Sequence, residues 1–160
     1  MFTLRAFEDG DLPLLRRWLY EPHVARWFPR PQGWLDEARR RRDTFSFIRH
    51  FIAQWEDGPV GFCQYYEYAR SGESWQGDIP LAGTYSIDYL IGERQALGRG
   101  LGRRMVSALL ERVRRETNAR RVIVQPERDN AASCRTLVSC GFHYDEKNRI
   151  YRLEFAKRHA

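Results

Sequence analysis

A glycine-rich segment in the middle of the chain, residues 95–102 (QALGRGLG), has a composition suited to binding an anionic group. Gly98, Gly100 and Gly102 lack a Cβ atom, so the backbone can turn tightly and approach a ligand closely. The residues that follow have helical spacing, and the first turn of a helix offers free N–H groups and the positive end of its dipole. The segment therefore predicts a pyrophosphate site, although a simple tight turn would use the same glycines.

Three arginines beside these glycines, Arg99, Arg103 and Arg104, would strengthen such a site if they face the ligand. Each is otherwise an ordinary surface arginine. The spacing excludes two familiar phosphate-binding motifs, because GxxxxGK followed by Ser or Thr is absent and GRGLGRR in mid-chain does not match the dinucleotide-binding fingerprint. What remains is QxxGxG, followed later by Asn130 and by a Gly-Phe pair at residues 141–142.

One carboxylate, Asp88, lies on the strand expected just before the glycines, over residues 84–92. Alternate side chains of a strand point to opposite faces, so Asp88 shares a face with Ser86 and Leu90 and not with the aromatic residues between them. With an ordinary pKa of about 3.9 it would be a weak base toward an ammonium group. The alternative is a solvent-exposed aspartate.

Composition narrows the class of protein. The chain has 160 residues, of which 42% are hydrophobic and 14% aromatic, so we expect a single domain over residues 1–160 with one core. Lysine plus arginine number 27 against 21 acids, a net charge of +6, and the arginine run at residues 39–42 is interpreted as a solvated basic face. A non-catalytic basic module that binds RNA or another anion is the alternative from a different class.

The three cysteines, Cys63, Cys134 and Cys140, form no CxxC pair and have no histidine at metal-ligand spacing. We therefore expect free thiols and no metal. The first residues are acidic and lack an apolar leader, and nowhere do eighteen apolar residues run together. These features predict a cytoplasmic protein with no membrane partner.

Hydrophobic periodicity predicts a mixed α+β order of elements. We expect strands over residues 2–7, 50–55, 60–68, 84–92 and 122–124, and a closing hairpin of residues 141–144 with 150–155. Helices are expected near residues 12–19, after Pro22, over 34–44, from the glycines to about 117, and over 130–139. The polar insertion at residues 70–82 has turn chemistry and is interpreted as a mobile loop that covers a substrate.

Together, QxxGxG after a strand and the later helix that contains Asn130 and ends in Gly-Phe resemble the GNAT acetyltransferases. The glycine motif can be aligned as Gln95, Gly98 and Gly100, or as Leu97, Gly100 and Gly102. The resemblance implies a splayed, mostly antiparallel central sheet flanked by helices, and direct acetyl transfer from acetyl-CoA to an amine without a metal. It also implies Asp88 as the catalytic residue and CoA contacts from Leu90, Ile91, Leu97, Gly98, Arg99, Gly100, Leu101, Gly102, Arg103, Arg104 and Asn130.

Within that superfamily the chain is most similar to the aminoglycoside 6'-N-acetyltransferases, through segments that agree in order between residues 18 and 142. The agreeing residues are His23, Val24 and Trp27; Pro59, Val60, Gly61, Phe62, Gln64 and Tyr66; Ser71, Gly72 and Trp75; Ile87, Asp88 and Leu90; and the LGRGLG segment. The similarity implies a small, aminoglycoside-like amine acceptor bound by Tyr66, Trp75 and Asp88, in a monomer or homodimer that binds no nucleic acid. A lysine-type siderophore precursor or a protein amine is the alternative acceptor.

Two positions depart from the family pattern. Many GNAT enzymes carry a tyrosine that protonates the leaving thiolate, and the aligned residue here is Leu137. A thiolate can leave unprotonated, since thiols have pKa values of about 8–9. The strand that ends at Gln125 and Pro126 also lacks the aspartate that relatives often carry there, which bears on acceptor recognition.

Overall fold

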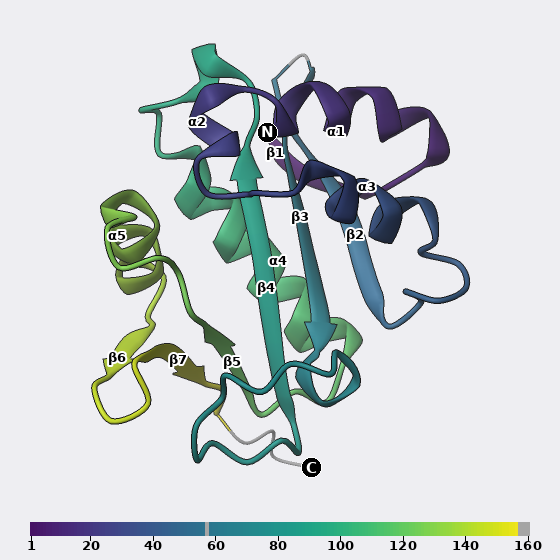
Figure 1. Cartoon of the computed structure of the whole chain (residues 1–160). Coiled ribbons are helices and arrows are strands. Elements are labelled where there is room, and N and C mark those ends of the chain that lie inside the picture. Colours follow the sequence, from purple (N-terminus) through teal and green to yellow (C-terminus); the bar gives the residue numbers. More distant parts are fainter. Residues whose placement is uncertain (57, 157–160) are drawn as a thin grey trace.

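The computed structural model describes residues 1–56 and 58–156, which form a seven-stranded sheet in the order β1-β2-β3-β4-β5-β7-β6 (Figure 1). The pairing of β4 with β5 is parallel and the other pairings are antiparallel. The α+β class and the mostly antiparallel sheet predicted from the sequence are confirmed. The strands are β1 (Phe2–Ala6), β2 (Ile48–Trp55), β3 (Gly58–Glu67), β4 (Thr84–Ile91), β5 (Arg121–Val124), β6 (His143–Asp145) and β7 (Ile150–Glu154).

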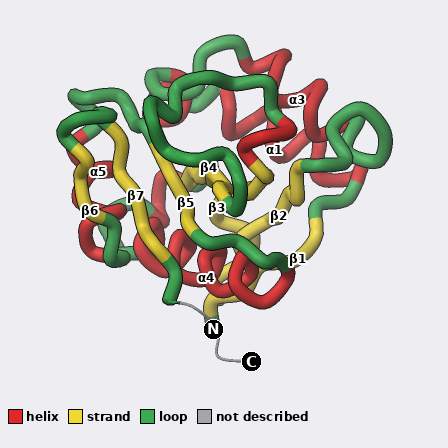
Figure 2. The backbone as a smooth tube through the Cα atoms, turned by 90° about the horizontal axis from the view of Figure 1, so that it is seen from below, coloured by secondary structure: helices red, strands yellow, loops and turns green. Residues whose placement is uncertain are grey.

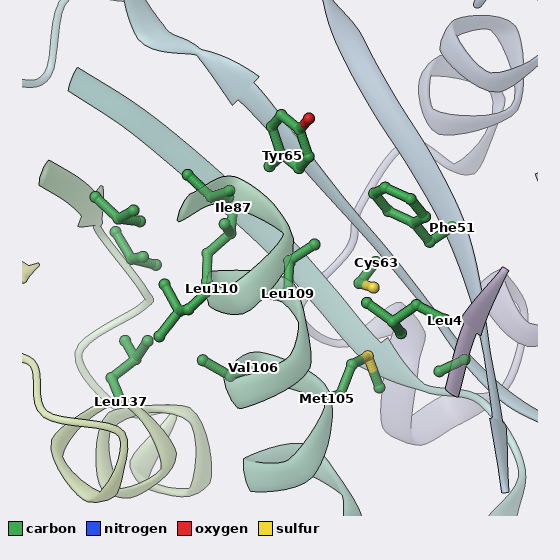
Figure 3. Close-up of a cluster of buried hydrophobic side chains, with 14 of the residues drawn as sticks. Leu4, Phe51, Cys63, Tyr65, Ile87, Met105, Val106, Leu109, Leu110 and Leu137 are labelled. Atoms are coloured by element: carbon green, nitrogen blue, oxygen red, sulfur yellow. The ribbon is translucent and has the colours of Figure 1, made fainter. Parts of the chain in front are cut away.

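Helices cover both faces of the sheet (Figure 2). On one face lie α1 (Leu12–Leu19), α2 (Pro22–Ala25) and α3 (Pro31–Arg39), whose apolar residues pack with Ile52, Phe62 and Leu90. On the other face α4 (Leu101–Glu116) packs against the sheet, and α5 (Ala131–Ser139) packs against α4. Figure 3 shows this second core, in which Met105, Val106 and Leu109 of α4 lie beneath side chains from β1 to β4.

The sheet parts between β4 and β5, and this gap positions the functional site. Only Thr84–Ser86 of β4 pair with β5, and Figure 1 shows the two strands diverging beyond that point. Pro126 explains the short pairing, because a proline has no N–H to donate to a ladder and tends to end a strand. Within the described residues, the β5-facing edge of β4 from residue 87 onward therefore has no strand partner.

The arginine-rich region differs from the prediction. The helix covers Pro31–Arg39 and not residues 34–44, because Pro31 occupies the first helical position that favours proline. The run at residues 39–42 is also not a uniformly solvated face. The side chain of Arg41 is only 9% exposed, forms an ion pair with Asp9 at 2.8 Å, and has its guanidinium 5.2 Å from the ring centre of Phe7.

The insertion at residues 70–82, predicted to be a mobile loop, is anchored at both ends. Near its start, the hydroxyl of Tyr68 accepts a 2.6 Å hydrogen bond from the backbone N–H of Trp75. Near its end, Asn148 of the β6–β7 turn donates to the Asp78 carboxylate at 2.7 Å and accepts from the Asp78 backbone N–H at 3.1 Å. The loop is thus held against the closing hairpin.

Candidate active site

A cavity of about 560 Å³ occupies the gap between β4 and β5. Its two halves meet at Asp88. One half is bordered by the helices on the Asp88 face and by the anchored loop, and the other half by the glycine segment and the start of α5. Asp88, predicted to be catalytic, and Leu90 and Ile91, predicted to contact CoA, all line this cavity.

Asp88 belongs to a row of polar side chains across the sheet. In the strand register His50 of β2 lies opposite Gln64 of β3, and Gln64 lies opposite Asp88. The Gln64 side chain is 2% exposed and donates from Nε2 to Oδ2 of Asp88 at 2.9 Å. Neighbouring strands therefore fix the direction in which the carboxylate points.

The pKa of Asp88 differs from the ordinary value expected from the sequence. Burial raises the pKa of Asp88 to about 7, the hydrogen bond from Gln64 opposes this, and the nearby carboxylates of Glu73 and Glu37 raise it further. The prediction of a weak base is wrong for this reason. A carboxylate with a pKa near neutral suits general-base catalysis at physiological pH.

The half of the cavity beside the anchored loop is aromatic and acidic. Tyr66 and Trp75, both predicted from the sequence, line it together with Glu73. The Tyr66 hydroxyl donates to Oε1 of Glu73 at 2.5 Å, and the Trp75 indole donates to Oε2 of the same carboxylate at 3.1 Å. These two bonds hold Glu73 in place in a half whose other lining residues include His23, Trp27, Phe28 and Trp34.

Sequence reasoning missed Glu37 of α3. Burial raises its pKa, Glu73 raises it further, and a hydrogen bond from Gln64 opposes both. Glu37 lies three residues after Trp34, so the two share one face of the helix, and Trp34 lines the cavity. This spacing was the feature of the sequence that could have identified Glu37. Asp78, in the same loop as Glu73, does not line the cavity and pairs with Lys147 at 2.5 Å in the exposed loop anchor.

The glycine segment forms the wall of the second half. Gly98 and Gly100 both have φ of 73°, in the left-handed region that favours glycine, and Gly100 immediately precedes α4. Among the described residues, no atom lies within 4 Å of a Cβ added at either position. This open space in front of the α4 N-terminus fits the predicted anion site. The predicted residues that line the cavity here are Leu97, Gly98, Gly100, Leu101, Gly102 and Arg103.

The structure favours the alignment through Leu97, because Leu97 lines the cavity whereas the Gln95 amide turns toward Glu93 at 3.4 Å. Two predicted contacts lie elsewhere. Arg99 places its guanidinium 5.7 Å from the ring centre of Trp55, beside a separate hollow, and Arg104 is exposed outside the cavity. Consecutive positions in a turn and a helix point in different directions, so only Arg103 of the three side chains faces the site.

The start of α5 completes this half. The predicted residue Asn130 lines the cavity and caps the helix, accepting from the backbone N–H of Ser133 at 3.2 Å. Ser133 lines the cavity as well, and its Oγ lies 2.5 Å from the hydroxyl of Tyr89 on β4. Sequence reasoning missed this hydroxyl pair, because residues 44 positions apart meet only once the sheet has parted.

Leu137, the position aligned with the family tyrosine, is fully buried against α4 (Figure 3). Of the cysteines, Cys63 is buried in the same core, and Cys134 lines a different hollow near Tyr144 and Tyr151. In residues 1–56 and 58–156, no three His, Cys, Asp or Glu side chains are grouped so that they could hold a metal ion. No helix of that part of the chain is both long and apolar enough to cross a membrane.

Comparisons with known proteins agree with this geometry. Residues 8–150 match the family model described as an acetyltransferase (GNAT) domain. The chain is 27% identical over 146 residues to aminoglycoside N(6')-acetyltransferase type 1 of Klebsiella pneumoniae, covering 88% of this chain and 73% of that protein. The corresponding protein of Serratia marcescens gives the same values.

Solved structures show the same fold. A crystal structure of aminoglycoside acetyltransferase AAC(6')-Ib with coenzyme A and kanamycin superposes with a TM-score of 0.82 at 24% identity, covering 96% of this chain and 95% of that one. Spermidine N-acetyltransferase from Vibrio cholerae superposes with a TM-score of 0.70 at 15% identity, covering 90% and 82%. With the family model matched over most of its length, the chain belongs to the GNAT family of acetyl-CoA-dependent N-acetyltransferases.

Proposed function

We propose that this enzyme acetylates a primary amine of a small, cationic, aminoglycoside-like acceptor, by direct transfer within a complex that contains both substrates. The observation that carries the proposal is the position of Asp88 where the two halves of the cavity meet, with a pKa of about 7 and with Glu73 and Glu37 nearby. The similarity to aminoglycoside N(6')-acetyltransferases supports the choice of acceptor.

The proposed roles follow from the placement of the residues. Asp88 accepts a proton from the acceptor ammonium, and Glu73 attracts that cation into the aromatic half of the cavity. The backbone near Leu90 and Ile91, on the free edge of β4, polarises the acetyl carbonyl as charge develops. The glycines before α4 and the α4 N-terminus hold the CoA pyrophosphate. Aligning amine and thioester supplies a further several kcal/mol by proximity.

A lysine-type acceptor is the second candidate, favoured by one observation. Gln125 lines the cavity where relatives often carry an aspartate, and its amide donates to the backbone carbonyl of Arg149 at 3.3 Å. This wall therefore offers no negative charge at that position, which suits an acceptor with fewer ammonium groups.

The test compares kanamycin, a free lysine derivative and a lysine peptide as acceptors, by release of the CoA thiol at low and moderate salt. The proposal predicts the highest kcat/KM for kanamycin, and a decrease with salt as the carboxylates are screened. A higher kcat/KM for the lysine derivative or the peptide would refute the aminoglycoside acceptor and leave the acetyltransferase activity intact. Calorimetry with acetyl-CoA addresses the alternative of a non-catalytic RNA-binding module, which predicts no micromolar CoA site.

The role of Asp88 is tested by Asp88→Asn. We expect turnover to fall by about tenfold to a thousandfold with acetyl-CoA affinity nearly unchanged. In the parent enzyme kcat/KM should rise with pH through about 7, as Asp88 ionises. Unchanged turnover in the variant would remove Asp88 from the mechanism.

A further inference from the structure

The hydroxyl pair of Tyr89 and Ser133 has no part in the roles assigned so far. It joins the free edge of β4 to the first turn of α5, with the two oxygens 2.5 Å apart. Both residues line the central cavity, and burial is the main cause of a raised pKa of the Tyr89 phenol. A partly buried, protonated phenol that faces a substrate cavity is placed to donate a hydrogen bond to a bound molecule.

The position of Tyr89 relative to Asp88 indicates which part of the bound substrates its hydroxyl would face. Adjacent residues of a strand point to opposite faces, yet both of these side chains line the cavity because it opens at the edge of β4 that β5 has left. An acetyl group held at this edge would have Asp88 on one side and Tyr89 on the other. Since the amine approaches from the Asp88 side, the sulfur of the thioester falls on the side of Tyr89 and Ser133.

Further along this face of α5 the cavity is lined by Thr136, whose hydroxyl lies beside Gly102 in the glycine segment. Leu137 lies one turn after Ser133 and is 0% exposed, packed in the core against α4. In acyl transfer the new N–C bond forms, the C–S bond breaks, and its electron pair moves to sulfur. A developing thiolate in a partly closed cavity is stabilised by a hydrogen-bond donor aimed at it.

We propose that Tyr89, held by Ser133, donates a hydrogen bond to the CoA sulfur as the C–S bond breaks. This inference rests on the proposed acetyl transfer from acetyl-CoA. Either hydroxyl can donate across this pair. In the proposed arrangement Ser133 is the donor, which leaves the phenol proton free to point at sulfur and strengthens it as a donor.

The proton balance closes without a proton leaving Tyr89. Burial keeps the pKa of Tyr89 above its ordinary value, and hence above the value of about 8–9 of a thiol, so the phenol retains its proton beside a thiolate. The acceptor ammonium loses one proton to Asp88 before attack, and Asp88 passes it to water. The second proton leaves the nitrogen by the same route as the N–C bond forms and the C–S bond breaks. The thiolate leaves as such, or takes a proton from water.

The test is a pH titration of the thiol of CoA bound to the enzyme, followed by the ultraviolet difference from the enzyme without CoA, since the thiolate absorbs there much more strongly than the neutral thiol. Tyr89→Phe removes one oxygen and keeps the ring. We expect the ionisation constant of the bound thiol to fall by about tenfold to a hundredfold, as for the loss of one hydrogen bond to a charged group. The kcat should fall in proportion, with the acetyl-CoA dissociation constant unchanged.

Tyr85→Phe is the matched control, because Tyr85 lies on the same face of β4 but outside the cavity, and it should leave the thiol unchanged. Ser133→Ala should change the ionisation constant in the same direction by a smaller factor, and it serves if Tyr89→Phe does not fold. Equal thiol ionisation in the parent and both variants, with CoA bound, overturns this inference alone. A parent enzyme that binds no CoA overturns the proposed function as well.

Discussion

Replacing Asp88 by asparagine should stabilise the folded protein while it impairs catalysis. Burial raises the pKa of Asp88 from 3.8 to about 7, so the folded state disfavours the ionised carboxylate relative to the unfolded chain. Well below pH 3.8 the group is protonated in both states. From there to pH 7 the folded state binds the additional proton, so the free energy of unfolding decreases as pH rises.

The size of the effect follows from the two pKa values. The folded and unfolded pKa values of Asp88 differ by about 3. This difference lowers the free energy of unfolding by at most about 4 kcal/mol above pH 7, and by about 1.6 kcal/mol at pH 5. An asparagine carries no such penalty at any pH. Its own packing adds an unknown constant, which cancels when the gain is compared between two pH values. The gain in unfolding free energy from Asp88→Asn should thus be about 2.5 kcal/mol larger at pH 8 than at pH 5.

The assay is urea unfolding of the parent and the variant at pH 5, 6, 7 and 8, with thermal unfolding as a second measurement. Asp78→Asn is the control, because the pKa of Asp78 is shifted in the opposite direction: it is lowered, first of all by the hydrogen bond from Lys147. Replacing Asp78 should therefore not stabilise the protein at neutral pH. A gain from Asp88→Asn that is the same at pH 5 and pH 8 would refute a raised pKa for Asp88.

Three further predictions concern separate parts of the site. Gly100→Val should weaken acetyl-CoA binding at least tenfold by calorimetry, because φ of 73° strains a branched residue and the side chain would fill the open space before α4. The control variant Gly33→Ala in α3 should bind acetyl-CoA normally. Glu37→Gln should raise the KM of a polycationic acceptor several-fold and leave that of acetyl-CoA unchanged; equal effects on both would refute its placement in the acceptor half. Gly92→Ala should lower the stability by about 1–3 kcal/mol in urea unfolding, since its Cβ would lie 2.1 Å from the Trp18 ring, and a neutral result would contradict this packing.

The parts of the site that the sequence predicted are those set by local pattern. Strand alternation placed Asp88 on the face opposite Ile87, and the glycine spacing placed the turn before α4. Both depend on residues a few positions apart. Glu37 and the Tyr89–Ser133 pair belong to the site only because distant elements meet there, and a single sequence carries little information on such contacts.

The pKa values in the site were even harder to predict from the sequence. The raised pKa of Asp88 depends on burial and on carboxylates 15 residues away in Glu73 and 51 away in Glu37, so no local pattern encodes it. Side-chain direction in turns and short helices was similarly out of reach. Arg99 and Arg103 are four residues apart, and one packs on Trp55 whereas the other faces the cavity.

The anchoring of the loop by the closing hairpin has a consequence for how this enzyme could change its acceptor during evolution. Trp75 and Glu73 line the part of the cavity proposed to hold the acceptor. The segment that follows them is held by Asn148 of the β6–β7 turn. Asn148 packs so closely on this segment that its Oδ1 would lie 2.1 Å from a Cβ added at Gly77. A substitution in the β6–β7 turn would therefore shift the wall without altering any residue that touches the acceptor. Laboratory selection for new amines should yield changes at this remote turn as well as in the cavity, and these changes should leave the acetyl-CoA half of the enzyme unaffected.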